Sequence, residues 1–342
     1  CIRDRDTSIN MAMQPFKMMV GDMVNEKQKG LAYSIQSFLC NAGSLVGFLF
    51  PFIFTWIGIS NIAPQGVVPD SVIYSFYIGA AILILCVIYT TVKVKEMPPA
   101  EYAEYHGITE EEEKEKINMV KLLVKAPKAF WTVGLVQFFC WFAFMFMWTY
   151  TNGSVAANVF DAPTVETVVN GVSKVMLDTK SIQYQDAADW VGVLFAVQAI
   201  GSVLWAVCIP LFKDRKLIYS LSLVLGGLGF ISTYFVHNQY VLFISFLLIG
   251  CAWAAMLALP FTILTNALSG GHMGTYLGLF NGTICIPQIV AASLGGSILA
   301  LFTPKGMLPP EINMLVMAGV MLIIGSVCVY LIKETKGEQA KA

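Results

Sequence analysis

Two carboxylates near the start of the chain, Asp6 and Asp22, are the side chains whose type and position most suggest chemistry. They bound the stretch D-T-S-I-N-M-A-M-Q-P-F-K-M-M-V-G-D, and we interpret residues 6–24 as an incomplete membrane-spanning helix. A charged group at the bilayer centre costs about 3 kcal/mol, so an ionisable residue there indicates a functional site. The alternative is that this stretch is an ordinary polar N-terminus without a role in function.

Amide side chains inside other apolar runs are the second signal. They are Gln36, Asn41, Gln137, Gln198, Asn281 and Gln288. Asn281 and Gln288 are seven residues apart and therefore share a helix face. Pro287 lies beside them, and a proline inside a span frees a backbone carbonyl that a neighbour, water or a cavity must satisfy. Such amides either join helices, at about 0.6 kcal/mol per contact, or bind a polar solute.

The run 138–150 is dense in aromatic residues. Flat amphipathic rings can stack on the apolar face of a pyranose, but they also pack helices together and anchor them at the membrane interface. Trp148 and Tyr150, near the end of the run, fit interface anchors. Trp141 lies in mid-run and is a better ligand candidate, and Trp253 occupies a similar position in a later run.

A short basic turn, P-L-F-K-D-R-K, occupies residues 210–216. Asp214 and Arg215 in this turn, between further cations, could hold two helix ends together on one side of a membrane. The alternative is an ordinary cationic loop.

These residues need membrane helices to position them, and the composition supplies such helices. The chain is 57% hydrophobic and only 13% charged, whereas an ordinary soluble domain has about 25% charged residues. A span needs about 20 apolar residues. After 6–24, eight apolar runs have this length: 31–57, 71–95, 129–151, 189–212, 216–236, 239–265, 274–302 and 312–333.

Other classes of protein and site find little support. A net charge of −1 gives no sign of nucleic-acid binding. The eight cysteines occur singly, without a C-x-x-C pair, so we expect neither a disulfide framework nor a metal site. The chain begins with Cys1, and we expect that its N-terminus is missing.

Two long polar connections, 96–128 and 152–188, interrupt the apolar runs. The first separates three spans from six, so we expect a partial N-terminal bundle over 1–95, a linker over 96–128, a six-helix bundle over 129–333 and a tail over 334–342. Lys and Arg gather on the side of the linker and the tail, and cytoplasmic loops carry such an excess. The linker and the C-terminus are therefore expected in the cytoplasm.

Several stretches resemble the sucrose–proton symporter branch of the glycoside–pentoside–hexuronide symporters, which belong to the major facilitator superfamily. Its fourth and fifth helices resemble N-M-A-M-Q-P-F-K-M-M-V-G-D and Q-S-F-L-C-N-A-G-S-L-V-G. Its tenth and eleventh resemble A-W-A-A-M-L-A-L-P-F-T-I-L-T-N-A-L and G-T-Y-L-G-L-F-N-G-T-I-C-I-P-Q, and its seventh resembles Q-F-F-C-W-F-A-F-M-F-M-W. The resemblance covers nearly the whole chain outside the two long loops. It implies an all-α multi-spanning protein with a complete C-terminal bundle and an N-terminal bundle that lacks its first three helices.

The resemblance also implies roles for individual residues. In that branch a carboxylate early in the fourth helix binds the proton, with an Asn one turn later, and Asp6 and Asn10 match these positions. A cytoplasmic charge cluster would comprise Lys17, Asp22, Asp214 and Arg215. The candidates for contacts with the sugar are Gln36, Trp141, Gln198, Asn281 and Gln288.

The expected function is proton-coupled import of a sugar, a disaccharide or glycoside, by alternating access in a cell or inner membrane, by a monomer that needs no cofactor. One alternative is a sodium-coupled glycoside carrier or a carrier of another small polar solute. A membrane enzyme would need a nucleophile with its base, or a metal cluster. The histidines fall in or beside loops, away from intramembrane carboxylates, so we expect no enzyme: they are His106, His237 and His272.

Overall fold

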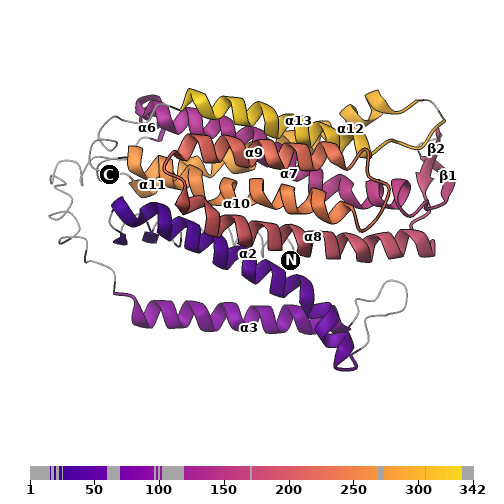
Figure 1. Ribbon diagram of the computed structural model, residues 1–342, viewed down its shortest axis with the longest axis horizontal. Helices are drawn as coiled ribbons and strands as arrows, with labels where there is room; N and C mark the ends of the chain where they lie inside the picture. The colour runs from indigo at the N-terminus through magenta and orange to yellow at the C-terminus, as the bar shows by residue number, and fades with distance from the viewer. Residues whose placement is uncertain are drawn as a thin grey trace. The chain divides into compact units, whose positions relative to one another are not determined.

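The computed structural model is almost wholly helical in the residues that it describes (Figure 1). These are residues 16, 19–20, 23–24, 26–59, 70–95, 98, 101, 119–169, 172–268, 273–304 and 306–332. The chain divides into two compact units. The larger unit comprises residues 1–41 and 117–342, and the smaller unit comprises residues 42–116.

The larger unit holds the first part of α2 (Glu26–Trp56) and a series of helices from α6 onward. They are α6 (Met119–Lys125), α7 (Lys128–Asn158), α8 (Ile182–Cys208) with η1 (Ile209–Leu211), α9 (Arg215–Ser232), α10 (Leu242–Ala267), α11 (Met273–Phe280), α12 (Gly282–Phe302), and α13 (Ile312–Cys328) with η2 (Val329–Leu331). In the smaller unit, α2 ends and α3 (Asp70–Lys93) follows.

Seven of the described helical segments are long and apolar enough to cross a membrane, namely α3, α7, α8 with η1, α9, α10, α11 with α12, and α13 with η2. They confirm the all-α multi-spanning class and correspond to seven of the predicted runs. The remaining run, 31–57, lies within the continuous helix α2 except for the last residue of the run. Residues 6–24 fall almost entirely outside the described residues.

The connection 152–188 is more structured than its polar composition suggested. Helix α7 continues to Asn158, and an antiparallel hairpin of β1 (Thr164–Val169) and β2 (Val172–Leu177) follows. The segments T-V-E-T-V-V and V-S-K-V-M-L are rich in β-branched residues, which favour strands. The sequence between them is Asn-Gly, the pair typical of tight hairpin turns.

In the larger unit, helix α10 packs on α8, α9 and α7. Glycine allows the closest of these approaches. A Cβ at Gly250 of α10 would meet the backbone of Gln198 and Ser202 on α8, and the Ser202 hydroxyl donates to the Gly250 carbonyl at 2.7 Å. Small residues at helix contacts are the usual means of association in a bilayer, where apolar burial drives little.

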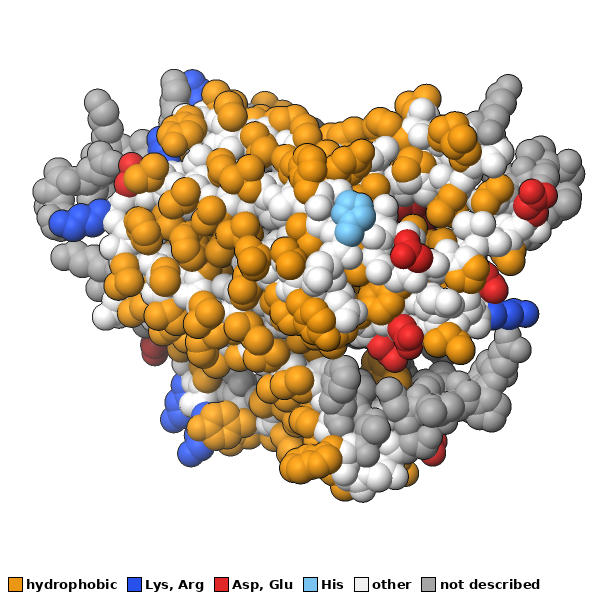
Figure 2. Space-filling model, turned by 45° about the vertical axis from the view of Figure 1, so that its right-hand side comes forward, with side chains coloured by type: hydrophobic (Ala, Val, Ile, Leu, Met, Phe, Trp, Pro, Cys, Tyr) orange, Lys and Arg blue, Asp and Glu red, His pale blue; other side chains and the backbone are white. Residues whose placement is uncertain are grey.

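Figure 2 shows hydrophobic side chains gathered over a large part of one face of the molecule. Exposed large hydrophobic residues on the spans of the larger unit include Leu204 of α8, Ile244 of α10 and Ile289 of α12, each more than half exposed. Such a surface suits contact with lipid acyl chains. In the smaller unit, α3 is likewise apolar on nearly all sides, and Tyr74 contacts Phe54 near the end of α2, with ring centroids 6.4 Å apart.

Candidate functional site

One face of α7 carries Gly134, Gln137, Trp141 and Trp148. Intervals of three, four and seven residues bring side chains onto one side of a helix. On this side of α7 the Gln137 side chain is fully buried, at 0% exposed, whereas the Trp148 side chain is 44% exposed. The stripe therefore runs from the interior of the larger unit toward its surface.

Three tryptophans meet where this stripe faces α10, and we call Trp141, Trp148 and Trp253 the tryptophan cluster. The ring centroid of Trp253 lies 5.8 Å from that of Trp141 and 5.7 Å from that of Trp148, with both pairs nearly perpendicular. Phe144 supports Trp253 from the side at 4.8 Å. The structure thus brings together two residues, Trp141 and Trp253, that the sequence singled out separately.

The interpretation of Trp148 and Tyr150 as interface anchors is wrong for Tyr150, which is only 8% exposed. The Tyr150 hydroxyl lies where a Cβ at Gly295 of α12 would be. Trp148 keeps an exposed part but packs against Trp141 at 6.3 Å. The exposure of Tyr150 and Trp148 is set by the helices that pack against α7, and the place of a residue along an apolar run does not reveal that packing.

Two residues at this cluster have buried polar atoms without a hydrogen-bond partner among the described residues: the indole Nε1 of Trp141, and both amide atoms of Gln137, one turn before it on α7. Elsewhere in the larger unit, Nε2 of Gln36 on α2 and both amide atoms of Asn266, near the end of α10, are also buried and unpaired. A buried polar group left unpaired costs about 1–3 kcal/mol. Such groups therefore indicate a place where a polar ligand or water binds.

Helix α2 reaches the same part of α10. The Ser37 hydroxyl donates to the carbonyl of Ala254 at 3.3 Å, and the rings of Tyr33 and Phe261 lie 6.1 Å apart. Gln36 precedes Ser37 in the chain and is half-buried. Its unpaired Nε2 therefore belongs to a helix that contacts α10 directly beside Trp253.

The other amides predicted to contact sugar lie on neighbouring helices. Gln198 is buried on α8, and its backbone carbonyl faces Gly250 of α10. Asn281 is half-buried between α11 and α12, with its Nδ2 atom 4.0 Å from the sulfur of Cys285. Gln288 is half-buried on α12. Helix α12 packs on α7, so all three amides lie on helices that contact α7 or α10.

Four of the predicted coupling and charge-cluster residues lie outside the described residues: Asp6, Asn10, Lys17 and Asp22. Asp214 and Arg215 are described. The Asp214 carboxylate caps α9, because one of its oxygens accepts from the backbone N–H groups of Lys216 at 2.9 Å and Leu217 at 3.0 Å. Arg215 is the first residue of that helix. In the structure, Asp214 therefore stabilises the N-terminus of α9 as its N-cap residue.

The predicted set of site residues omitted two residues that the structure places at the tryptophan cluster: Gln137 and Trp253. A signal for Gln137 was available, because it precedes Trp141 by four residues and must share its helix face. Trp253 was named as similar to Trp141 but could not be joined to it without knowing which faces of α7 and α10 meet.

Comparisons with known proteins identify the family and the fold of the chain. A family model described as Major Facilitator Superfamily matches residues 9–176 and 155–342, which together cover most of the chain. A crystal structure of the E. coli fucose:proton symporter superposes with a TM-score of 0.57 at 13% sequence identity, over 91% of this chain and 71% of that chain. At this identity the likeness shows the fold alone. No curated protein matches the sequence. Because seven helical segments among the described residues can cross a membrane, the protein is an integral multi-pass membrane protein, and the chain belongs to the Major Facilitator Superfamily.

Proposed function

We propose that the protein is a secondary active transporter that imports a sugar, a disaccharide or glycoside, together with protons. The observation that carries this proposal is the tryptophan cluster beside the unpaired amide of Gln137. Sugars present apolar C–H faces and a rim of hydroxyl groups. A tryptophan face suits the first, and buried amides that lack internal partners suit the second.

The position of the cluster supports binding between helices of the larger unit. Gln137 and Trp141 come from α7, Trp253 comes from α10, and Gln36 comes from the part of α2 that contacts α10. Gln198, Asn281 and Gln288 on α8 and α12 would widen the set of hydroxyl contacts. A solute bound among several helices responds to changes in their packing, as alternating access requires. The structural neighbour is itself a fucose:proton symporter, which agrees with a sugar as substrate.

The proton would be bound by Asp6, with Asn10 one turn later. Burial raises the pKa of a carboxyl group and a nearby cation lowers it, so movement that changes these surroundings would load and release the proton. One charge crossing a potential of 100 mV gains about 2.3 kcal/mol. At 1.4 kcal/mol per tenfold, this corresponds to roughly fifty-fold accumulation of the sugar.

The distribution of charge supports a cytoplasmic linker and C-terminus. In the larger unit, Lys128 at the start of α7 and Lys213 before α9 lie at the same end, because α8 runs back from the hairpin. The hairpin end carries Lys174 and Lys180 together with Asp161, Glu166 and Asp178, so lysine is not in excess there. An excess of lysine marks the cytoplasmic side. We therefore retain the division into a partial bundle over 1–95, a cytoplasmic linker, a six-helix bundle and a tail.

The substrate is tested first by binding. Tryptophan fluorescence of the purified protein is titrated with sucrose and with maltose, and we expect saturable quenching by one of them. Trp141→Phe, which removes an unpaired indole N–H, should weaken the binding. The matched control is Trp131→Phe on the same helix, where the indole is 55% exposed, and it should bind normally. Equal binding by both variants would contradict the site.

Coupling is tested in liposomes by following the external pH after sugar addition. We expect alkalinisation that persists when choline replaces sodium and disappears in Asp6→Asn. Uptake that requires sodium would overturn the proton assignment and leave the sugar site standing. Absence of binding by any disaccharide in the fluorescence assay would overturn the substrate class.

A further inference from the structure

A carboxyl group outside the tryptophan cluster occupies an unusual position at the hairpin end of the larger unit. Glu311 lies in the connection between α12 and α13, directly before the membrane span Ile312–Leu331. Its carboxyl atoms fill the space that a Cβ at Gly153 of α7 would take. Glycine at this position therefore provides the seat for the carboxyl group, and the backbone N–H of Glu311 donates to the Pro309 carbonyl at 2.9 Å.

Glu311 is half-buried and is the N-cap residue of α13, but its side chain makes no capping hydrogen bond to that helix end, so it lacks the partner that would usually stabilise a negative charge there. Tyr150, one turn earlier on α7, is the ionisable group that faces it, and the described parts of α12 and α13 packed here present no charged side chain. No Lys or Arg in the described ranges forms an ion pair with Glu311, and burial alone raises the pKa of this carboxyl group to about 7. Lys305, in the same connection, lies outside the described residues.

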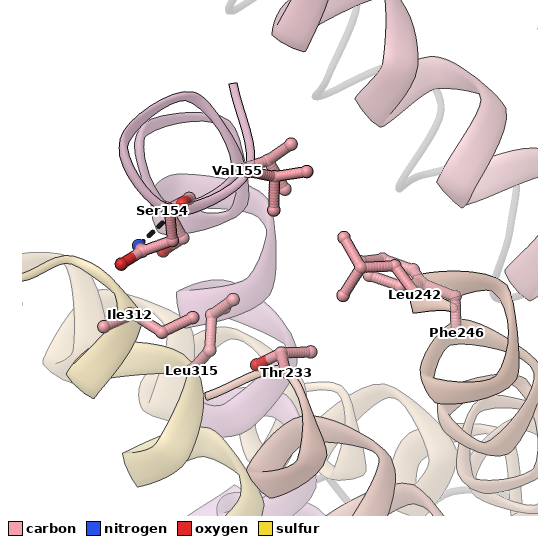
Figure 3. Close-up of a pocket in the computed structure, with 9 residues that line it drawn as sticks. Ser154, Val155, Thr233, Leu242, Phe246, Ile312 and Leu315 are labelled. Atoms are coloured by element: carbon pink, nitrogen blue, oxygen red, sulfur yellow. Dashed lines mark hydrogen bonds between the residues drawn. The ribbon is translucent and has the colours of Figure 1, made fainter. Parts of the chain in front are cut away.

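An apolar pocket adjoins the seat (Figure 3). Ile312 and Leu315 of α13 line it together with Ser154 and Val155 of α7. Ile312 directly follows Glu311 in the chain, and Ser154 directly follows Gly153. The polar groups of the pocket are already bonded within their own helices. The Ser154 hydroxyl donates to the Tyr150 carbonyl at 2.7 Å, and the Asn158 amide donates to the Ser154 carbonyl at 2.8 Å. An ionised Glu311 would therefore find no partner by turning toward the pocket.

We propose that Glu311 is a proton-binding site that holds the α12–α13 connection on α7 while it is protonated and releases the connection when it is ionised. A neutral carboxyl group can rest on the backbone of Gly153 at small cost, whereas a carboxylate without a partner must reach water. Because Ile312 follows Glu311 and lines the pocket, release also loosens the contact between α13 and α7. The proposal concerns Glu311 alone, so it requires neither the proton-binding role proposed for Asp6 nor a particular transported solute.

The proposal is tested by observing the proton directly. Infrared difference spectra of the purified protein between pH 5 and pH 9 should show a protonated carboxyl band that titrates near pH 7 and is absent in Glu311→Gln. Glu166→Gln is the control, because Glu166 is an exposed glutamate on β1 of the same unit. The band should remain in this control. A wild-type band that titrates only below pH 5, or one that survives in Glu311→Gln, would overturn the proposal.

Gly153→Ala provides a second test that leaves Glu311 in place. The added methyl group occupies the seat, so the carboxyl group should move to water and titrate near pH 4.5, the ordinary value for glutamate. Gly192→Ala on α8 is the matched control, because its added Cβ would meet no atom within 4 Å, and it should leave the titration near pH 7. An unchanged titration in Gly153→Ala would show that the seat does not set the proton affinity.

Release of the connection has its own readout in amide hydrogen exchange. The backbone N–H groups of Glu311, Asn313 and Met314 are bonded within the connection and the first turn of α13. Corrected for intrinsic rates, their protection should fall several-fold between pH 6 and pH 8 in the wild type and stay constant in Glu311→Gln. Constant protection in both proteins would refute release, even if the infrared band were present.

Discussion

Gln137→Leu should stabilise the empty protein and weaken its binding of sugar at the same time. Leucine has nearly the volume of glutamine, so the packing of this fully buried position on α7 is retained. The substitution removes an amide whose two polar atoms have no partner among the described residues. Burying such a group costs about 1–3 kcal/mol, and we expect the unfolding free energy of the ligand-free protein to rise by about this amount.

The loss of affinity follows from the same two atoms. If each forms one neutral hydrogen bond to a sugar hydroxyl, at about 0.5–1.5 kcal/mol, the variant loses about 1–3 kcal/mol of binding. At 1.4 kcal/mol per tenfold, this is a decrease in affinity of roughly 5- to 150-fold. Gln137→Leu should therefore raise the unfolding free energy of the ligand-free protein by about as much as it weakens the free energy of sugar binding.

The assay combines denaturant unfolding in detergent with the fluorescence titration of sugar. Gln185→Leu is the control, because Gln185 is exposed and its amide donates to the Thr179 carbonyl at 2.7 Å. It should not gain stability or lose sugar affinity. A Gln137→Leu protein that is less stable than the wild type and binds sugar normally would show that this amide is satisfied inside the protein, and the reasoning would fail.

Three further predictions follow from local contacts. Burial raises the pKa of Glu311 from 4.5 to about 7. The contribution of this group to the unfolding free energy is therefore fully present below about pH 4.5, and the unfolding free energy falls by about 3 kcal/mol as the pH rises through 7. Glu311→Gln should remove this part of the pH dependence of unfolding. Gly250→Ala should destabilise the protein by more than about 2 kcal/mol because the methyl group meets the backbone of α8, whereas Gly192→Ala, with open space, should be neutral or stabilising by about 0.5–1 kcal/mol in the same unfolding assay. Asp214→Ala removes the cap of α9 and should cost about 0.5–2 kcal/mol, and Asp214→Asn should restore most of this.

The spans could be predicted because hydrophobic length alone defines them. The run 129–151 became α7, and 239–265 became α10, with ends shifted by a few residues. The end of α7 moved furthest, to Asn158, because T-N-G-S-V-A-A-N is polar enough to resemble a loop although it packs inside the unit. The hairpin after it was missed for a similar reason, since short strands of mixed polarity give no membrane signal.

The site was predicted residue by residue and could not be assembled from the sequence. Trp141 and Trp253 stood out because each lies in mid-run, but their contact depends on which faces of α7 and α10 meet. That choice is made by long-range packing, such as the contact of Ser37 with Ala254, which no local pattern reveals. In the sequence, Glu311 does not differ from any other glutamate in a polar loop. Its unusual environment depends on its contact with Gly153 of α7, which is distant in the sequence.

The close approach of α8 and α10 at Gly250 has a mechanical consequence. Leu247 and Gly250 of α10 meet Gly201 and Gln198 of α8 through backbone atoms, and Ser202 bonds across the same contact. Backbone atoms cannot change rotamer, so sliding one helix along the other would require several steric clashes at once. We therefore expect α8 and α10 to move as one rigid body during any conformational cycle. Flexibility of the larger unit would then reside where side chains rather than backbones mediate the contact, such as the face of α7 that carries Gln137 and Trp141.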